Sequence, residues 1–423
     1  MIQRTERFKA LEEHENEIEF LRVSEARKNN KIEDKNLQLI DFWQGCVGNC
    51  GMMAALGALS LRPEFSSKIA PLIDHPKGLL HFKMFCEGAE VRVTVDDRLF
   101  FQKTEKRDLA YAASLRNDEQ GRDLVGLSSF FEKAYVKQTC FKDYLKSECS
   151  SASFVFSCFS NSMTNLIMYD ADESKETLTK HLQFEIGNNS SVVLGFTPNI
   201  YYPVDSENDG HFFTVIGYNE QEKAVKLYDP FWEPGRCVSS KSLPPSLTMD
   251  ADDNNGELWL ALKDVDQREV ELCSLHSEKM YKSAYQVNKK ISLSDFDENN
   301  FARLDICKIT LRQTSKLMFN LFSYCHEFED LDITVRADDD EKKEVELDEE
   351  LPSILNSLYC DHHRKGEPMT QYNQRFQLQP NVYIISLELS PLVEDQTEEN
   401  LNLLLRIGSF EECTFESLNV KAE

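Results

Sequence analysis

The stretch WQGCVGNCGMMAALGALSL, residues 43–61, constrains the fold of this chain more than any other segment. Its first half places two glycines close to two cysteines, a composition that favours a tight turn. Its second half is rich in alanine, leucine and methionine, which are apolar and form helices readily. We therefore expect a turn that leads from Cys50 into a buried helix, with Pro63 ending that helix or opening the next element.

The rest of the sequence first predicts a mixture of helices and strands and then almost only strands. Alternating valines predict a strand within 89–101, and apolar residues at helical spacing predict an amphipathic helix over 127–138. The pattern then becomes β-rich, with strands expected at 190–197, 211–218, 224–230 and 256–265, the last leading into a helix. From about residue 277, short strands alternate with polar turns, as in a β-sandwich, and an acidic loop over 337–350 interrupts them. The expected fold class is α+β.

Composition narrows the classes of function. A chain of 423 residues predicts two or three domains, and a net charge of −26 argues against nucleic acid as a general partner. No apolar run is long enough to cross a bilayer, and residues 1–30 are charged, which predicts a solvated helix or lead-in and not a signal peptide. The scattered cysteines fit reduced thiols, so we expect a cytoplasmic location.

Cys50 has the setting of a nucleophile. A thiol at a helix N-terminus experiences the positive end of the helix dipole, which favours the thiolate. The Cys50 N–H and the side-chain amide of Gln44, six residues earlier, are candidate donors to an oxyanion. Two alternatives stay open, a buried structural cysteine and a zinc site. The zinc ligands would come from Cys46, Cys50, Cys360, His362 and His363, in two groups far apart in sequence.

His211 is the candidate base, because it follows a polar loop and opens an expected strand. If residues 219–221 form the hairpin turn, Tyr218 pairs with Glu222 and His211 lies directly opposite Asp229. Asp229 would then accept a hydrogen bond from the imidazole and direct its other nitrogen towards Cys50. The alternative is that Asp229 merely ends a strand and His211 is a satisfied surface residue.

At this point the sequence resembles the calpain family of cysteine proteases, over roughly residues 40–410. The resemblance rests on motifs in the family's order: WQGCVGNCGMMAALGALS, VRVTVDDRLF, LSSFFEKAYVKQ, GHFFTVIGYN, YDPFW, GELWLALKDVDQREVELCSL, QRFQLQPNVYIISLELSP and LNLLLRIGS. It implies a papain-like core of two subdomains, 31–155 with the nucleophile and 156–276 with the histidine. A C2-like β-sandwich would follow over 277–423. No calmodulin-like EF-hand domain is expected, because the chain ends after the sandwich, as in non-classical members.

The resemblance also implies roles for individual residues. Cys50 would be the nucleophile, His211 the base, Asp229 the orienting group in place of the usual asparagine, and Gln44 part of the oxyanion hole. Calcium is the implied cofactor, with ligands matched in part by Asp41 and Glu132 at one site and by Asp253, Asn255 and Glu257 at another. Two departures stand next to the nucleophile, where Asn49 replaces the usual aspartate and Gly51 the usual tryptophan.

Three hypotheses of function follow from this reading. The first is an intracellular cysteine endopeptidase that makes limited cuts in protein substrates, with calcium dependence an open question. The second is a catalytically inactive calpain-like scaffold that binds proteins, suggested by the departures at Asn49 and Gly51. The third assigns the C-terminal sandwich a targeting role, in which calcium bridges its acidic loop to anionic lipid.

Overall fold

The computed structural model describes most of the chain. The described residues are 17–26, 32, 39–45, 47–104, 109–111, 125–140, 142–148, 150–171, 175–197, 200, 210–231, 256–265, 268–292, 296, 301–323, 328–338, 354–357, 370–391 and 400–418. They fall into two compact units. The first comprises the described parts of Met1–Asn161 and Ile167–Leu275, and the second those of Ser162–Leu166, His276–Asp361 and Gly366–Glu423.

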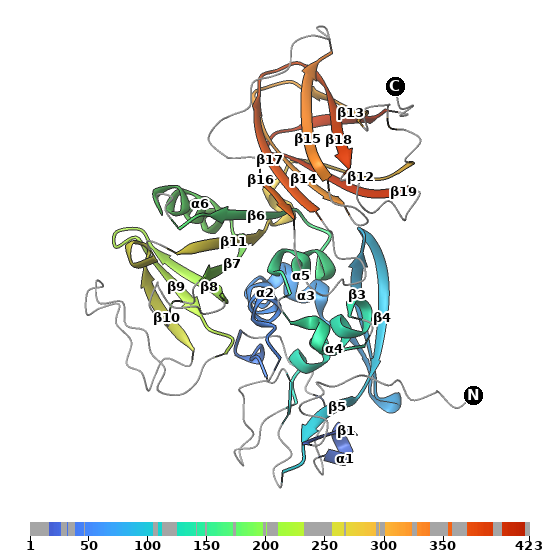
Figure 1. Ribbon diagram of the computed structural model, residues 1–423, viewed down its shortest axis with the longest axis vertical. Coiled ribbons are helices and arrows are strands. Elements are labelled where there is room, and N and C mark those ends of the chain that lie inside the picture. The colour runs from blue at the N-terminus through green and yellow to red at the C-terminus, as the bar shows by residue number, and fades with distance from the viewer. Residues whose placement is uncertain are drawn as a thin grey trace. The chain divides into compact units, whose positions relative to one another are not determined.

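The first unit mixes helices with sheets, so the α+β class is confirmed. Its helices are α1 (Val23–Ala26), α2 (Cys50–Ser60), α3 (Pro63–Ile69), α4 (Ser128–Thr139), α5 (Ala152–Phe159) and α6 (Lys175–Gly187), with short 3-10 turns at Leu39–Asp41, His75–Lys77, Leu145–Ser147 and Leu262–Val265. Helix α2 lies beside α5 within this unit (Figure 1). The predicted helices after Cys50 and within 127–138 are both present, and Pro63 opens a new helix.

Three sheets contain strands of this part of the chain, and two of them are described first. Strands β2 (Leu72–Asp74), β3 (Leu79–Cys86) and β4 (Ala89–Asp96) form one antiparallel sheet. The longest sheet has the order β10-β9-β8-β7-β11-β6, where the strands are β6 (Thr164–Tyr169), β7 (Ser191–Thr197), β8 (His211–Asn219), β9 (Ala224–Tyr228), β10 (Glu257–Ala261) and β11 (Glu269–Leu275). The strands expected at 190–197, 211–218, 224–230 and 256–265 are therefore found, although the third ends at Tyr228.

Helix α2 is buried almost throughout, as its apolar sequence predicts. Residues Gly51 to Leu59 are all buried, and the helix packs on α5 and on strands β7 and β8. An apolar helix of this kind is stable because each buried aliphatic side chain contributes about 1.5–3 kcal/mol relative to an exposed one. The buried surroundings fix the helix whose first residue is Cys50.

The N-terminal segment differs from the prediction. A helix or lead-in was expected over residues 1–30, whereas β1 (Ile18–Arg22) is a strand that pairs antiparallel with β5 (Arg98–Gln102). The edge of β5 supplies backbone partners that the local sequence does not reveal, and the ring of Phe20 packs against that of Phe100 at 4.7 Å. For residues 18–22 the predicted helix was wrong, because pairing with a distant strand outweighed a weak helical pattern. The next four described residues do form the short helix α1.

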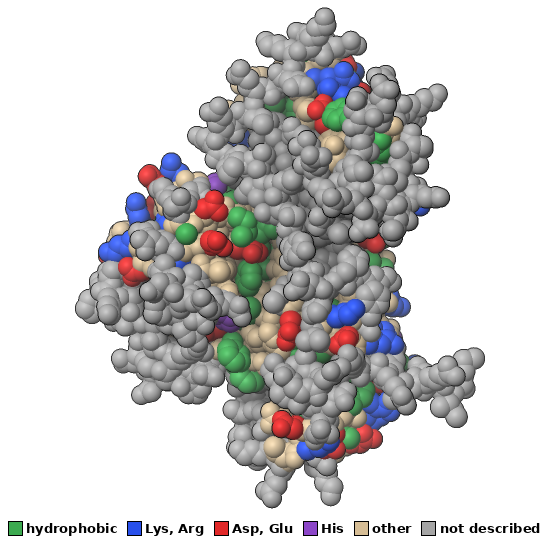
Figure 2. All heavy atoms as spheres, in the orientation of Figure 1, with side chains coloured by type: hydrophobic (Ala, Val, Ile, Leu, Met, Phe, Trp, Pro, Cys, Tyr) green, Lys and Arg blue, Asp and Glu red, His purple; other side chains and the backbone are tan. Residues whose placement is uncertain are grey.

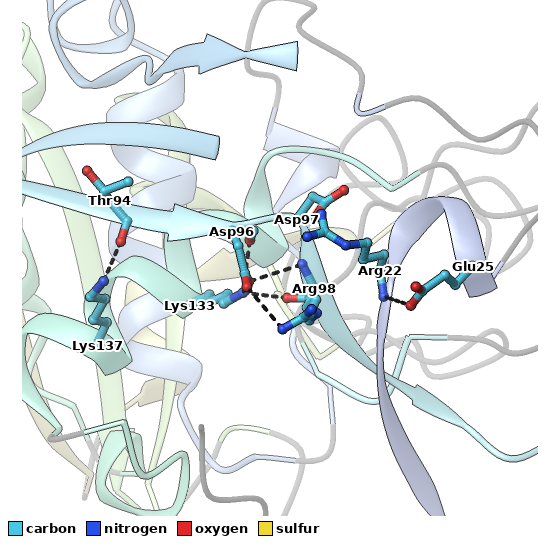
Figure 3. Close-up of polar contacts among 8 residues, drawn as sticks. All are labelled: Arg22, Glu25, Thr94, Asp96, Asp97, Arg98, Lys133 and Lys137. Atoms are coloured by element: carbon cyan, nitrogen blue, oxygen red, sulfur yellow. Dashed lines mark hydrogen bonds and ion pairs between the residues drawn. The ribbon is translucent and has the colours of Figure 1, made fainter. Parts of the chain in front are cut away.

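Buried charges join α4 to the sheet strands (Figure 3). Lys133 is fully buried, pairs with the carboxylate of Asp96 and donates to the carbonyl of Arg98 at 2.6 Å. Lys137, one turn later, donates to the carbonyl of Thr94. Arg22 pairs with Asp97, at the break that divides the predicted strand 89–101 into β4 and β5. The contacts of Lys133 and Lys137 hold α4 against β4 and β5.

The second unit contains two sheets that share one apolar core. Their orders are β12-β19-β14-β17-β16 and β15-β18-β13-β20, with β12 (Ser283–Ser292), β13 (Ala302–Leu311), β14 (Ser315–Ser323), β15 (Phe328–Ala337), β16 (Ile354–Ser357), β17 (Thr370–Leu378), β18 (Val382–Pro391), β19 (Asn400–Ser409) and β20 (Cys413–Ser417). A 3-10 turn at Glu278–Met280 precedes them. Ile309 of one sheet and Phe319 of the other belong to the same buried cluster, so inward faces of both sheets form the core. The β-rich pattern expected from residue 277 is confirmed.

The described part of the chain carries charges of both signs (Figure 2) and no membrane-spanning helix. On the face drawn in Figure 2, described acidic and basic side chains are interspersed. Within the described residues, no helix has both the length and the apolar character needed to cross a membrane.

Candidate active site

Cys50 is the first residue of α2, as predicted. Its side chain is partly exposed, and Asn49 precedes it with a backbone φ of −109°, outside the helix. The Asn49 carbonyl accepts hydrogen bonds from the N–H groups of Met52 (3.0 Å) and Met53 (3.1 Å), which start the helix. The N–H groups of a helix's first turn have no intrahelical acceptor, so the Cys50 N–H is placed to bind an anionic oxygen.

His211 and Asp229 lie together at the end of the β8–β9 hairpin. Nε2 of His211 is 2.8 Å from Oδ1 of Asp229, and both side chains are buried. The same Oδ1 accepts the N–H of Phe231 at 2.8 Å, which orients the carboxylate. Because Asp229 occupies Nε2, the other ring nitrogen of His211 is left for Cys50, and the thiol acts on the imidazole as a hydrogen-bond partner.

The contact arises through a different register from the one expected. Asn219 pairs with Ala224, and a bulge between Val215 and Gly217 shifts the register, so that Thr214 pairs with Tyr228. One step further, Asp229 would face Phe213, and His211 sits diagonally across from Asp229. The prediction that residues 211 and 229 are directly opposite was wrong. Diagonal neighbours on one face are still within reach of long side chains, so the hydrogen bond forms.

The surroundings of His211 favour its protonated form. Burial of the ring disfavours the charge, but hydrogen bonds and charges from Asp229 and Cys50 outweigh it and raise the pKa of His211 to about 10. A protonated imidazole beside a thiol is the arrangement in which a thiolate is stabilised as an ion pair.

Gln44 is buried in the loop that leads to Cys50. Its side-chain Nε2 donates to the carbonyl of Val47 at 2.7 Å, and its backbone N–H donates to the carbonyl of Pro230 at 2.7 Å, next to Asp229. A side-chain amide carries two N–H donors, so one remains beyond the bond to Val47. The loop geometry therefore ties Gln44 to both sides of the site.

Gly51 is required by a close approach of the backbone. A Cβ built at this position would lie 2.2 Å from the carbonyl oxygen of Ser150 and 3.5 Å from the ring of Phe212. No side chain fits there without movement of the segment at Ser150. The space next to the nucleophile is thus occupied by other parts of this chain, which accounts physically for the glycine.

Three of the candidate calcium ligands, Asp41, Glu132 and Glu257, lie among the described residues. Among the described residues, no three His, Cys, Asp or Glu side chains are grouped closely enough to hold a metal ion. Glu132 accepts a hydrogen bond from Nδ2 of Asn49 at 2.8 Å, and Glu257 pairs with Lys226. Asp41 is buried near Tyr228; burial and the charges of Asp229, Asp41 and Glu257 together raise the pKa of Tyr228. Calcium binding by the predicted ligands therefore stays a prediction.

Other predicted ligands lie outside the described residues. These are Asp253 and Asn255 of the second calcium set and Cys46, Cys360, His362 and His363 of the zinc alternative.

The sequence analysis missed the hydrogen bond between Asn49 and Glu132 and the approach of Ser150 to Gly51. The only sequence signals were Asn49 and Gly51, the two unusual residues that flank Cys50. Neither residue indicates which distant residue it contacts.

Comparison with known proteins is consistent with this geometry. The chain is 24% identical over 310 residues to the calpain-2 catalytic subunit of Bos taurus, covering 67% of this chain and 42% of that protein. It is 27% identical over 289 residues to the human calpain-2 catalytic subunit (61% and 38%) and 25% identical over 285 residues to calpain clp-1 of Caenorhabditis elegans (61% and 35%). The alignments thus span less than half the length of these relatives. The family model described as calpain family cysteine protease matches residues 3–233, more than half of the chain, which therefore belongs to the calpain family of cysteine proteases.

Proposed function

We propose that the chain is an active cysteine endopeptidase that makes limited cuts in protein substrates in the cytoplasm. The observation that carries this proposal is the arrangement around His211, with Asp229 on Nε2 and Cys50 as its other partner. This is the set of groups that thiol catalysis needs: a nucleophile, a base within hydrogen-bonding reach and a group that orients the base.

The reaction would proceed by acyl transfer. The Cys50 thiolate attacks the substrate's peptide carbonyl carbon, and the carbonyl oxygen becomes an oxyanion bound by the Cys50 N–H and the remaining N–H of Gln44. The imidazolium of His211 gives its proton to the leaving amine as the C–N bond breaks. Water then attacks the thioester, His211 takes a proton from it, and the carboxylic acid leaves as Cys50 is regenerated.

The decisive experiment compares Cys50→Ala with a matched control, Cys86→Ala. Neither cysteine forms a disulfide and both are partly exposed, but Cys86 ends β3 and has no role in the proposed reaction. We expect the wild type and Cys86→Ala to cleave a casein-type substrate and to be labelled by an epoxide inhibitor, and Cys50→Ala to do neither. Cleavage or labelling that persists in Cys50→Ala would rule out the assignment.

The second candidate is an inactive scaffold that keeps the family fold. It is favoured by the contact at Gly51, where the Ser150 carbonyl and the Phe212 ring occupy space beside the nucleophile. Under this hypothesis the wild type and Cys50→Ala bind the same partners, and neither cleaves casein while both are well folded.

Calcium dependence stays a prediction of the family resemblance, because the described ligands are engaged elsewhere. It is tested by the casein assay with calcium and with chelator. The predicted C2-like character of the sandwich and its contact with lipid are also proposals. Partition of the chain onto anionic vesicles that is unchanged by calcium would count against the lipid contact.

A further inference from the structure

We propose that Glu132 is a positioning residue for the nucleophile, acting through Asn49. This inference rests on the proposed function and concerns the same site. Glu132 holds the side chain of Asn49 and so fixes the turn from which α2 starts, with Cys50 as its first residue.

The contact is direct and shielded from water. Nδ2 of Asn49 donates to Oε1 of Glu132 at 2.8 Å, and the two side chains are 0% and 1% exposed. A hydrogen bond from an amide to a carboxylate is stronger than one between neutral groups, and burial removes competition from water. The bond joins residues 83 positions apart, so it sets where the turn sits and not merely its local shape.

The same turn places Gln44. The carbonyl of Val47 accepts both the backbone N–H of Asn49 at 2.8 Å and Nε2 of Gln44 at 2.7 Å. A shift of Asn49 therefore moves the nucleophile and the candidate oxyanion donor together. Glu132 thus acts on two groups of the site while touching neither.

Glu132 is well suited to this role because its helix is anchored. Lys133, the next residue of α4, is bound to Asp96 and to the carbonyl of Arg98, and Lys137 is bound to the carbonyl of Thr94 (Figure 3). These bonds keep α4 on β4 and β5, so the carboxylate of Glu132 is presented from a rigid element.

The chemistry of the pair makes a specific demand on residue 49. Asparagine can donate to the carboxylate, whereas aspartate would place a second acceptor against it, so the hydrogen bond between residues 49 and 132 would be lost. Exchanging the two functions, with aspartate at 49 and glutamine at 132, restores one donor and one acceptor across the same contact.

The test compares Asn49→Asp, Glu132→Gln and the double variant with the wild type and with Glu90→Gln, a surface control. Each protein is treated with iodoacetamide, and alkylation of Cys50 is followed by peptide mass spectrometry relative to Cys86. The buried Cys158 reports folding, because its alkylation rises if the variant opens. Hydrolysis of a peptide substrate is measured in parallel, with kcat and KM separated.

We expect Asn49→Asp to slow alkylation of Cys50 with Cys158 still protected, and to lower kcat by about 100-fold, the effect of misplacing a catalytic group by roughly 1 Å. Glu132→Gln keeps an acceptor but loses the charge of the carboxylate, so it should be impaired less than Asn49→Asp, and the double variant should recover most of the loss. The peptide assay should show the same order in kcat with KM unchanged.

Two results would overturn the proposal: Cys50 alkylation in Asn49→Asp equal to that of the wild type, or a double variant no faster than Asn49→Asp. Absence of peptide hydrolysis by the wild type would instead overturn the proposed function, and the alkylation rates would still decide the role of Glu132.

Discussion

The cysteine side and the histidine side of the candidate site are held in different ways. Cys50 depends on Glu132 and Ser150, which approach its turn from distant parts of the sequence. His211 and Asp229 are 18 residues apart and are brought together by one hairpin. A local hairpin could be anticipated even with an incorrect register, whereas contacts between distant segments could not. The comparison therefore distinguishes the residues that are proposed to react from the residues that hold them in position.

The histidine side should give the largest effect, through Asp229→Ala. Loss of this carboxylate removes the group that orients the imidazole, and we expect kcat to fall by about 10²–10⁴-fold, the usual scale of acid–base catalysis. The control is Asp74→Ala, which removes a surface partner of Lys77. Activity of Asp229→Ala close to that of the wild type would mean that the hairpin contact is not catalytic.

Asp229→Ala should also change how the stability of the protein depends on pH. The pKa of His211 is raised in the folded state to about 10, above the value of about 6.5 expected when unfolded. The resulting stabilisation is complete below about pH 6.5 and is lost as the pH rises through about 10. Urea unfolding across this window should show a steeper loss of stability in the wild type than in Asp229→Ala.

On the cysteine side, Lys133→Met should cause the largest loss of stability. It removes the buried partner of the Asp96 carboxylate, which Arg98 also approaches at 3.7 Å, so we expect a cost of about 3 kcal/mol in the free energy of unfolding, the low end for breaking a buried pair. Lys77→Met, which breaks an exposed pair with Asp74, should change the urea midpoint very little. Equal midpoints for both variants would show that α4 is not anchored by Lys133.

Gly51→Ala should have an intermediate effect. The added methyl group would lie 2.2 Å from the Ser150 carbonyl, and overpacking of this kind costs about 1–3 kcal/mol. Gly187→Ala is the matched control, since a methyl group added there, at the end of α6, would meet nothing within 4 Å. We expect Gly187→Ala to be neutral or slightly stabilising in urea unfolding. A tolerated methyl at Gly51 would mean that the segment at Ser150 moves easily.

The smallest effect is expected from Thr214→Val, which tests the link between the two sides. The hydroxyl of Thr214 on β8 donates to the Ala54 carbonyl of α2 at 2.8 Å, and its loss costs about 1 kcal/mol. Thr139→Val removes a similar buried bond, to the Tyr135 carbonyl within α4. Both should lose similar stability, but only Thr214→Val should slow the alkylation of Cys50. Equal alkylation rates would show that the two sides are placed independently.

Local sequence patterns were enough to locate most elements and the reactive groups. Apolar periodicity is a local property, so it located α2, α4 and, in the second unit, the strands β13, β14, β15, β17, β18 and β19. The chemistry of thiol, imidazole and carboxylate made Cys50, His211 and Asp229 the candidates for the site. Four features came only from the folded chain: the strand β1, the bulge in β8, the hydrogen bond from Asn49 to Glu132 and the space at Gly51. Each of these depends on an edge, a register or a neighbour supplied by a remote segment, and no local pattern encodes the identity of that partner.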